Sequence, residues 1–136
     1  MSEFNWKEQF ADKVLTPQRG IKLIEPENHV FIGTGAAEPE VLVDALVEFS
    51  GHLADIELFH LLTTGVAPYA QEKYADKFRF NAFFIGDNVR SKVQQGIGDY
   101  TPIFLSEIPR LFDSGRLPLA VAMIQVSPPD ESGLPS

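Results

Sequence analysis

The chain of 136 residues contains no cysteine. It therefore has no disulfide bond, no thiolate nucleophile and no cysteine-ligated metal. It also lacks an apolar run long enough to span a bilayer. Residues 1–13, MSEFNWKEQFADK, are charged and polar where a signal peptide would have an apolar centre. These absences predict a cytoplasmic protein that does not enter a membrane.

Positive charge is scarce as well, since 11 lysines and arginines stand against 19 aspartates and glutamates and leave a net charge of −8. A protein of this charge is repelled by nucleic acid and by anionic membranes. We therefore expect neither among its partners. The three histidines, His29, His52 and His60, are far apart in the sequence and have no carboxylate at ligand spacing, so no metal site is predicted.

The hydrophobic pattern alternates between short apolar runs and amphipathic segments, and the length suits about one domain. Strands are expected at 29–32, 56–62, 78–85, 101–105 and 119–126. Helices are expected at 5–14, 16–24, 39–50, 87–95 and 106–112. The alternation predicts a single α/β domain over residues 1–136, with a mainly parallel sheet, flanking helices and right-handed crossovers.

Several helix signals are specific enough to be tested one by one. Thr16-Pro17 is typical of an N-cap followed by proline at the first helical position. Pro39 is expected to open the next helix and Gly51 to close it. Further caps are expected at Asp87 or Asn88 and at Ser106. The stripe predicted to be buried on the helix after Pro39 consists of Val41, Leu42, Ala45, Leu46 and Phe49.

Ligands of parallel α/β sheets bind beyond the carboxyl ends of the strands. Those ends fall here at residues 33–35, 63–65, 86–88, 106–107 and 127–128. The first of them opens the stretch FIGTGAAEPE, residues 31–40, where an apolar strand breaks into a Gly-Thr-Gly loop. Candidate site residues are therefore drawn from these five segments.

The glycine loop does not have the pattern of a phosphate-binding loop. A dinucleotide fingerprint needs a third glycine where Glu38 stands, and a P-loop would end in Gly-Lys-Ser/Thr. Glu38 and Glu40, at the start of the next helix, would also repel a phosphate. Two interpretations remain open. Gly33 and Gly35 either make only a tight turn, or their loop offers backbone N–H groups to an oxyanion.

Four stretches, FIGTGAAEPEVLVDALVE, DIELFHLLTTGVAPYA, DYTPIFLSEIPRLF and LPLAVAMIQVSPPDESG, resemble the N-terminal half of the acetyl-CoA hydrolase/transferase family. This group includes 4-hydroxybutyrate and succinyl-CoA:acetate CoA-transferases. The resemblance covers about residues 20–133. It implies a coenzyme A transferase-type fold and a parent enzyme about three times as long, built from two similar halves around the active site.

The resemblance also implies a reaction. A glutamate attacks an acyl-CoA thioester, which forms a mixed anhydride and releases CoA thiolate. The thiolate attacks the anhydride to give a glutamyl-CoA thioester. A small acceptor carboxylate then takes the CoA by the reverse steps, and water in the acceptor's place gives net hydrolysis. That glutamate lies in the family's second half, so no catalytic residue is expected here. Coenzyme A is then a substrate and no cofactor is permanently bound. The residues expected to bind substrate are Gly33, Thr34, Gly35, Ala36, Glu38, Pro39, His60 and Ser106.

The family pattern continues beyond DESGLPS, so the chain resembles an N-terminal fragment that is truncated within its own half. An unpaired sheet edge would promote association, and we expect a homo-oligomer. Among its own carboxylates, Glu38, Glu57 and Glu107 are candidate nucleophiles, and all three are disfavoured. His60 is either a core residue bonded to backbone or part of the pocket. Ser106 and Ser127 are favoured as caps, and the roles of Tyr69, Tyr74 and Tyr100 stay open.

Three functions follow from these observations. The first is a piece of a CoA-transferase or acyl-CoA hydrolase. The second is a non-catalytic domain of the same fold that binds an acyl-CoA, a carboxylate or a protein. The third is a related domain acting on sugar phosphates. The third lacks a basic cradle, because Arg19, Lys22 and Arg90 are scattered in the sequence.

Overall fold

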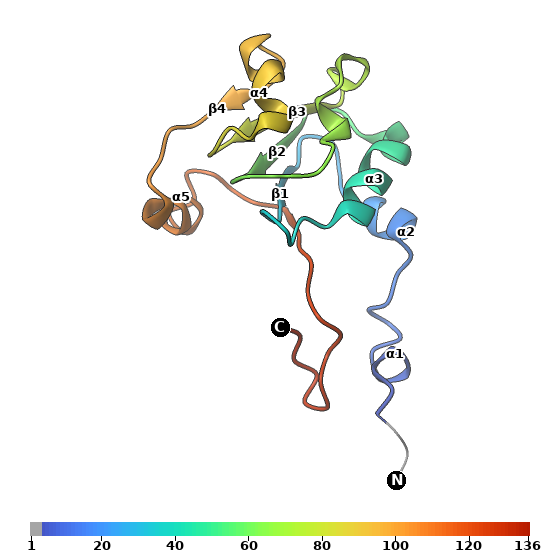
Figure 1. Ribbon diagram of the computed structural model, residues 1–136. Helices are drawn as coiled ribbons and strands as arrows, with labels where there is room; N and C mark the ends of the chain where they lie inside the picture. Colours follow the sequence, from blue (N-terminus) through green and yellow to red (C-terminus); the bar gives the residue numbers. More distant parts are fainter. Residues whose placement is uncertain (1–3) are drawn as a thin grey trace.

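A computed structural model describes residues 4–136 and has a single twisted sheet at its centre (Figure 1). The strands are β1 (His29–Ile32), β2 (Ile56–His60), β3 (Phe78–Ala82), β4 (Asp99–Tyr100) and β5 (Val121–Met123). All neighbouring strands are parallel, in the order β4-β3-β2-β1-β5. The chain thus builds outward from β1 to β4 and then returns to pair β5 with the other side of β1. This arrangement confirms the predicted α/β class.

Short helices precede the first strand and connect the later ones. They are α1 (Trp6–Gln9), α2 (Pro17–Ile21), α3 (Glu40–Glu48), α4 (Asp87–Gln94) and α5 (Ile108–Asp113). Single 3₁₀ turns occur at η1 (Ser50–His52), η2 (Pro68–Ala70), η3 (Glu72–Tyr74) and η4 (Leu105–Glu107). Within the described residues no helix is long and apolar enough to cross a membrane.

Two hydrophobic clusters pack against opposite faces of the sheet. The larger joins alternate residues of β1 and β2 to α2, α3 and η2, with Val30, Leu46 and Leu58 fully buried at its centre. The smaller packs Phe59 and Phe83 against Ile108 of α5. Figure 1 shows α5 set apart from α2 and α3 across the sheet. Strand β2 is therefore buried on both faces, as its nearly continuous apolar sequence predicted.

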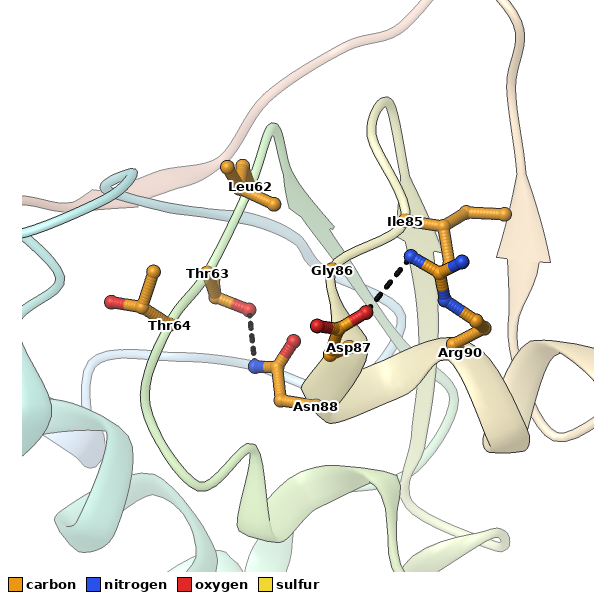
Figure 2. A pocket seen from close by; sticks show the side chains of 8 residues that line it. All are labelled: Leu62, Thr63, Thr64, Ile85, Gly86, Asp87, Asn88 and Arg90. Atoms are coloured by element: carbon orange, nitrogen blue, oxygen red, sulfur yellow. Dashed lines mark hydrogen bonds and ion pairs between the residues drawn. The ribbon is translucent and has the colours of Figure 1, made fainter.

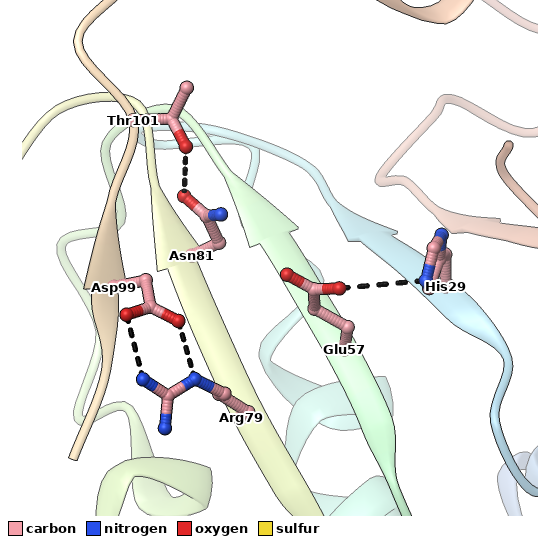
Figure 3. Close-up of polar contacts among 6 residues, drawn as sticks. All are labelled: His29, Glu57, Arg79, Asn81, Asp99 and Thr101. Carbon is pink, nitrogen blue, oxygen red and sulfur yellow. Dashed lines mark hydrogen bonds and ion pairs between the residues drawn. The ribbon is translucent and has the colours of Figure 1, made fainter. Parts of the chain in front are cut away.

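Part of the face that carries α5 is polar instead. His29 of β1 lies 3.5 Å from Glu57 of β2, and Arg79 of β3 pairs with Asp99 of β4 (Figure 3). The hydrogen bond from Arg79 holds the pKa of Asp99 below its ordinary value. These contacts join neighbouring strands near the end where the strands begin, so this polar region lies away from the strand ends at which ligands are expected.

Several helix predictions are confirmed and others need correction. Thr16 caps α2 through a bond from the Arg19 amide, as predicted, but α2 ends at Ile21 and α1 forms only one turn. On α3, Val41 is 69% exposed, whereas Val43 is buried. The predicted stripe was wrong at Val41 because this first-turn side chain lines a groove between α2 and α3 instead of meeting the sheet.

Element ends also differ from the predicted ones. Helix α3 stops at Glu48, and Gly51 lies within η1 rather than closing the helix. Strands β2, β3 and β5 are shorter than predicted. The fourth strand occupies Asp99–Tyr100 and not 101–105, since Pro102 has no amide for a sheet ladder. Gly86 is the N-cap residue of α4, and Ser106 lies inside η4 without capping a helix.

The packing of α3 predicts a sharp contrast between two of its side chains. Leu46→Ala should lower the free energy of unfolding by about 2–5 kcal/mol, because Leu46 is fully buried against the sheet. Val41→Ala, on the exposed side of the same helix, should change it by less than about 0.5 kcal/mol. Urea denaturation of both variants tests this. Equal losses would contradict the assignment of the buried face.

Candidate functional site

Three of the five predicted strand ends meet at one edge of the sheet. The segments after β1 (33–35), β2 (61–65) and β3 (83–88) lie side by side because these strands are neighbours. The other two do not join them. Ser106 lies in η4 and makes no side-chain hydrogen bond among residues 4–136, and Ser127 bonds to Ser136 in the C-terminal segment. Within residues 4–136, Ser106 therefore makes no side-chain hydrogen bond to the glycine loop with which it was grouped.

The glycine loop extends the pairing of β1 beyond the regular strand. The Gly35 amide donates to the Leu62 carbonyl at 2.7 Å, and Gly35 forms a parallel bridge with Thr63. The Thr34 hydroxyl donates to the same carbonyl at 2.7 Å and accepts from the Leu62 amide at 3.1 Å. On the other side the Gly33 amide donates to Met123 of β5 at 2.9 Å. The loop is thereby held in place from both sides.

These bonds bear on the two interpretations of the loop. Gly35 has φ +61°, and a Cβ on Gly33 would lie 3.0 Å from the Ala37 carbonyl oxygen, so both glycines meet the demands of a tight turn. Their amides are already engaged. Among residues 4–136, the amides of Thr34 and Ala36 make no backbone hydrogen bond. If the loop stabilises an oxyanion, the amides of Thr34 and Ala36 are therefore the donors that remain available for it.

Glu38 joins the glycine loop to the segment after β2. Its side chain is 7% exposed, and Oε2 accepts from the amides of Thr64 at 3.1 Å and Gly65 at 2.8 Å. A Cβ on Gly65 would lie 3.0 Å from either carboxylate oxygen. The sequence placed Glu38 at the start of a helix, where its charge would suit the helix end. The structure instead directs the carboxylate to the neighbouring loop, and Pro39 occupies the N-cap position of α3.

Asn88 holds the same segment from the opposite side. Its Nδ2 donates to the Thr63 hydroxyl at 3.0 Å (Figure 2) and to the Gly65 carbonyl at 2.9 Å. A Cβ on Gly86 would lie 2.7 Å from Asn88 Oδ1 and 3.0 Å from the Thr63 carbonyl, so this approach requires glycine. From the sequence, Asn88 was predicted only as a candidate helix cap. No local pattern indicated that it contacts residues more than twenty positions away.

An open cavity of about 400 Å³ lies between the ends of β2 and β3, within the size range of small-molecule sites. Its lining consists of Leu62, Thr63, Thr64, Ile85, Gly86, Asp87, Asn88 and Arg90 (Figure 2). Thr63 and Thr64, in the segment that Glu38 and Asn88 fix, form one wall. The cavity therefore adjoins the glycine loop through Leu62, whose backbone bonds to that loop.

None of the candidate carboxylates lines this cavity. Glu38 is committed to two amides, Glu57 lies beside His29 on the face that carries α5, and Glu107 is exposed in η4. The arrangement agrees with the expectation that the nucleophile lies outside this chain, which stays a prediction.

His60 and Tyr69 form a buried pair beneath the site. His60 is 0% exposed and stacks on Phe80 with ring centroids 5.9 Å apart, and the Tyr69 ring lies 6.1 Å away. Neither His60 nitrogen nor the Tyr69 hydroxyl has a hydrogen-bond partner within the described chain. Burial lowers the pKa of His60 to about 4 and raises the pKa of Tyr69. The core interpretation of His60 holds, whereas its expected backbone bond is not found.

Known proteins resemble this chain over nearly its whole length. A sequence model described as the acetyl-CoA hydrolase/transferase N-terminal domain matches residues 1–135. The chain belongs to the acetyl-CoA hydrolase/transferase family. It is 38% identical over 128 residues to a 4-hydroxybutyrate coenzyme A transferase of Clostridium kluyveri, covering 94% of this chain and 30% of that protein. The succinyl-CoA:acetate/propanoyl-CoA:succinate CoA transferase of Fasciola hepatica is 47% identical over 107 residues, covering 77% and 22%.

Solved structures agree on the fold of this acetyl-CoA hydrolase/transferase domain. RipA from Yersinia pestis superposes with a TM-score of 0.87 at 22% identity, covering 98% of this chain and 33% of RipA. The 4-hydroxybutyrate CoA-transferase of Porphyromonas gingivalis gives 0.72 at 26% identity, covering 95% and 28%. The fold is therefore coenzyme A transferase-like, as the sequence resemblance implied. The chain spans less than a third of the length of the curated relatives given above.

The contacts of Glu38 predict a large effect on stability. Glu38→Ala should lower the free energy of unfolding by about 2 kcal/mol, because two part-buried amides lose a charged acceptor. Glu38→Gln, which keeps an acceptor oxygen, should cost less. The matched control is Glu40→Ala, whose exposed side chain should contribute about 0.5 kcal/mol or less. Urea denaturation would contradict the proposed contact if Glu38→Ala and Glu40→Ala behaved alike.

Burial of His60 predicts a pH dependence of known sign. Its pKa falls from 6.5 to about 4 on folding, so between these values the unfolded state binds the proton and the native state does not. The free energy of unfolding should therefore fall by about 3 kcal/mol as the pH is lowered through this range. His60→Phe, which cannot titrate, should remove this part of the slope. Parallel stability curves for wild type and variant would show that His60 is not buried in neutral form.

Proposed function

We propose that the chain is the N-terminal domain of an acyl-CoA:carboxylate CoA-transferase and that residues 1–136 form one α/β domain of a longer, two-half enzyme. The observation that carries this proposal is the joining of the glycine loop, Thr63–Gly65 and the β3–α4 turn into one site by Glu38 and Asn88. Membership of the acetyl-CoA hydrolase/transferase family supports it, since the relatives named above are CoA transferases.

In this proposal the chain binds and orients substrate, and a glutamate in the other half is the nucleophile. Each acyl-transfer step passes through a tetrahedral oxyanion, which needs N–H donors fixed in advance. The amides of Thr34 and Ala36 fit that requirement, because the loop that carries them is held at Gly33 and Gly35. Acyl-CoA and a small carboxylate are then the substrates, and no cofactor is permanently bound.

The predicted substrate-binding residues differ in how well the structure supports them. Gly33, Thr34, Gly35, Ala36, Glu38 and Pro39 belong to one connected loop beside the cavity, and we propose that all six shape the substrate site. His60 acts from beneath by supporting the sheet, since it does not line the cavity. Ser106 would contact substrate only through a surface formed with another part of the enzyme.

The third hypothesis, action on sugar phosphates, has less support. Arg19 and Lys22 belong to the α2 region that packs against α3, whereas Arg90 lies on α4 beside the cavity. The three cations therefore do not form one phosphate cradle. A binding domain without catalysis remains the alternative, and it agrees with a cavity that none of Glu38, Glu57 and Glu107 lines. A homo-oligomer and a cytoplasmic location stay predictions.

The proposal is tested by expressing the full-length protein and the 136-residue chain in parallel. The full-length protein should transfer coenzyme A from acetyl-CoA to a short carboxylate and show ping-pong kinetics. The chain alone should show no turnover, since the nucleophilic glutamate is missing. Transfer by the purified chain would contradict the division of roles. Tight acyl-CoA binding by a full-length protein without turnover would favour the binding domain.

A further inference from the structure

The cavity between the ends of β2 and β3 has an uneven distribution of charge. Arg90 is the cation among the eight residues that line it (Figure 2). Its Nη2 lies 2.9 Å from Asp87 Oδ1, and the two side chains are 58% and 97% exposed. An exposed pair of this kind is weak. A guanidinium has five N–H donors, so Arg90 retains capacity for a second anionic partner.

The remaining walls of the cavity are apolar or neutral. Leu62 and Ile85 line it, and the Leu62 side chain is 41% exposed although its backbone is fixed by the glycine loop. Thr64 adds a hydroxyl, and Glu38 and Asn88 fix the segment that carries it. Gly86 also lines the cavity, and its lack of a side chain permits the close approach of Asn88 and Thr63. The cavity thus combines one cation with a short apolar wall.

This combination selects among anions. A phosphate or a dicarboxylate brings about two negative charges to a single guanidinium that already faces Asp87, so Asp87 repels it more strongly than it repels a monocarboxylate. A monocarboxylate carries one charge, matches the planar fork of arginine, and has an alkyl chain that gains by contact with apolar side chains.

We propose that this cavity is the binding site for a short-chain monocarboxylate. Arg90 pairs with its carboxylate, and Leu62 and Ile85 contact its alkyl chain. Asp87 competes for Arg90 and thereby weakens the binding. This inference rests on the proposed function, because it assigns the acceptor carboxylate to a defined part of that site, but it makes a separate prediction about binding.

The direct test titrates the full-length protein with butyrate and follows binding by saturation-transfer NMR. Arg90→Gln should weaken binding by about tenfold or more, because a charge-assisted contact is lost. Arg90→Lys, which keeps the charge but not the planar fork, should be intermediate. Asp87→Asn should strengthen binding about two- to threefold by removing the competing acid. Arg19→Gln on α2, with the same loss of charge away from the cavity, should leave binding unchanged.

Two results would overturn the inference. One is equal butyrate affinity in Arg90→Gln and Arg19→Gln, which would show that Arg90 makes no specific contact with the carboxylate. The other is binding of inorganic phosphate that depends on Arg90 while butyrate does not bind, which would make this a phosphate site. If Arg90→Gln fails to fold, Asp87→Asn decides, since unchanged or weaker butyrate binding in that variant contradicts the competition.

A kinetic measurement separates this inference from the proposed function. In an acetyl-CoA:butyrate transfer assay, Arg90→Gln should raise the KM for butyrate about tenfold and leave the KM for acetyl-CoA nearly unchanged. If Arg90→Gln is active with an unaltered KM for butyrate, the inferred binding site is wrong and the proposed function stands. Absence of transfer together with Arg90-dependent butyrate binding would remove the function and retain the binding site.

Discussion

The site depends on one buried carboxylate. Glu38 Oε2 accepts hydrogen bonds from two successive amides, those of Thr64 and Gly65, and so joins the segment after β1 to the segment after β2. Buried amides without an acceptor are costly, and a buried carboxylate without donors costs more. The carboxylate and the two amides therefore satisfy one another, and the two segments that carry them have little freedom to move apart. Gly65 must lack a side chain because a Cβ there would press on the carboxylate.

Further contacts extend this fixed point across the sheet. Asn88 holds Thr63 and Gly65 from α4, while Thr34 bonds to Leu62 from the glycine loop. Three strand ends are thereby held together by three side chains, two from the loop after β1 and one from α4. A site fixed in this way suits a reaction that needs N–H donors and substrate held in advance, which is the demand of acyl transfer. The parallel sheet positions these loops, and the loops carry the groups that are proposed to bind substrate.

The sequence predicted the strands of the sheet well, because the burial of apolar residues determines where these strands lie. Strand β1 has its predicted limits, and β2 and β3 begin at their predicted residues, because their apolar residues must be buried, on both faces of β2 and mainly on one face of β3. The 101–105 strand was mispredicted because Pro102 has no N–H for a sheet ladder, and Val41 was mispredicted because its exposure depends on distant partners. The same limit applies to the site. The residue types at 33–38 identified the loop, but no local pattern showed that Glu38 would reach Gly65 or that Asn88 would reach Thr63.

Amide hydrogen exchange of the wild-type chain tests the central claim most directly. If Glu38 and the extended pairing hold the site together, the amides of Gly35, Thr64 and Gly65 should exchange slowly, at rates comparable to those of the strands, although all three lie in loops. The amides of Thr34 and Ala36 should exchange much faster. Rapid exchange at Thr64 and Gly65, equal to that of Thr34 and Ala36, would contradict the account.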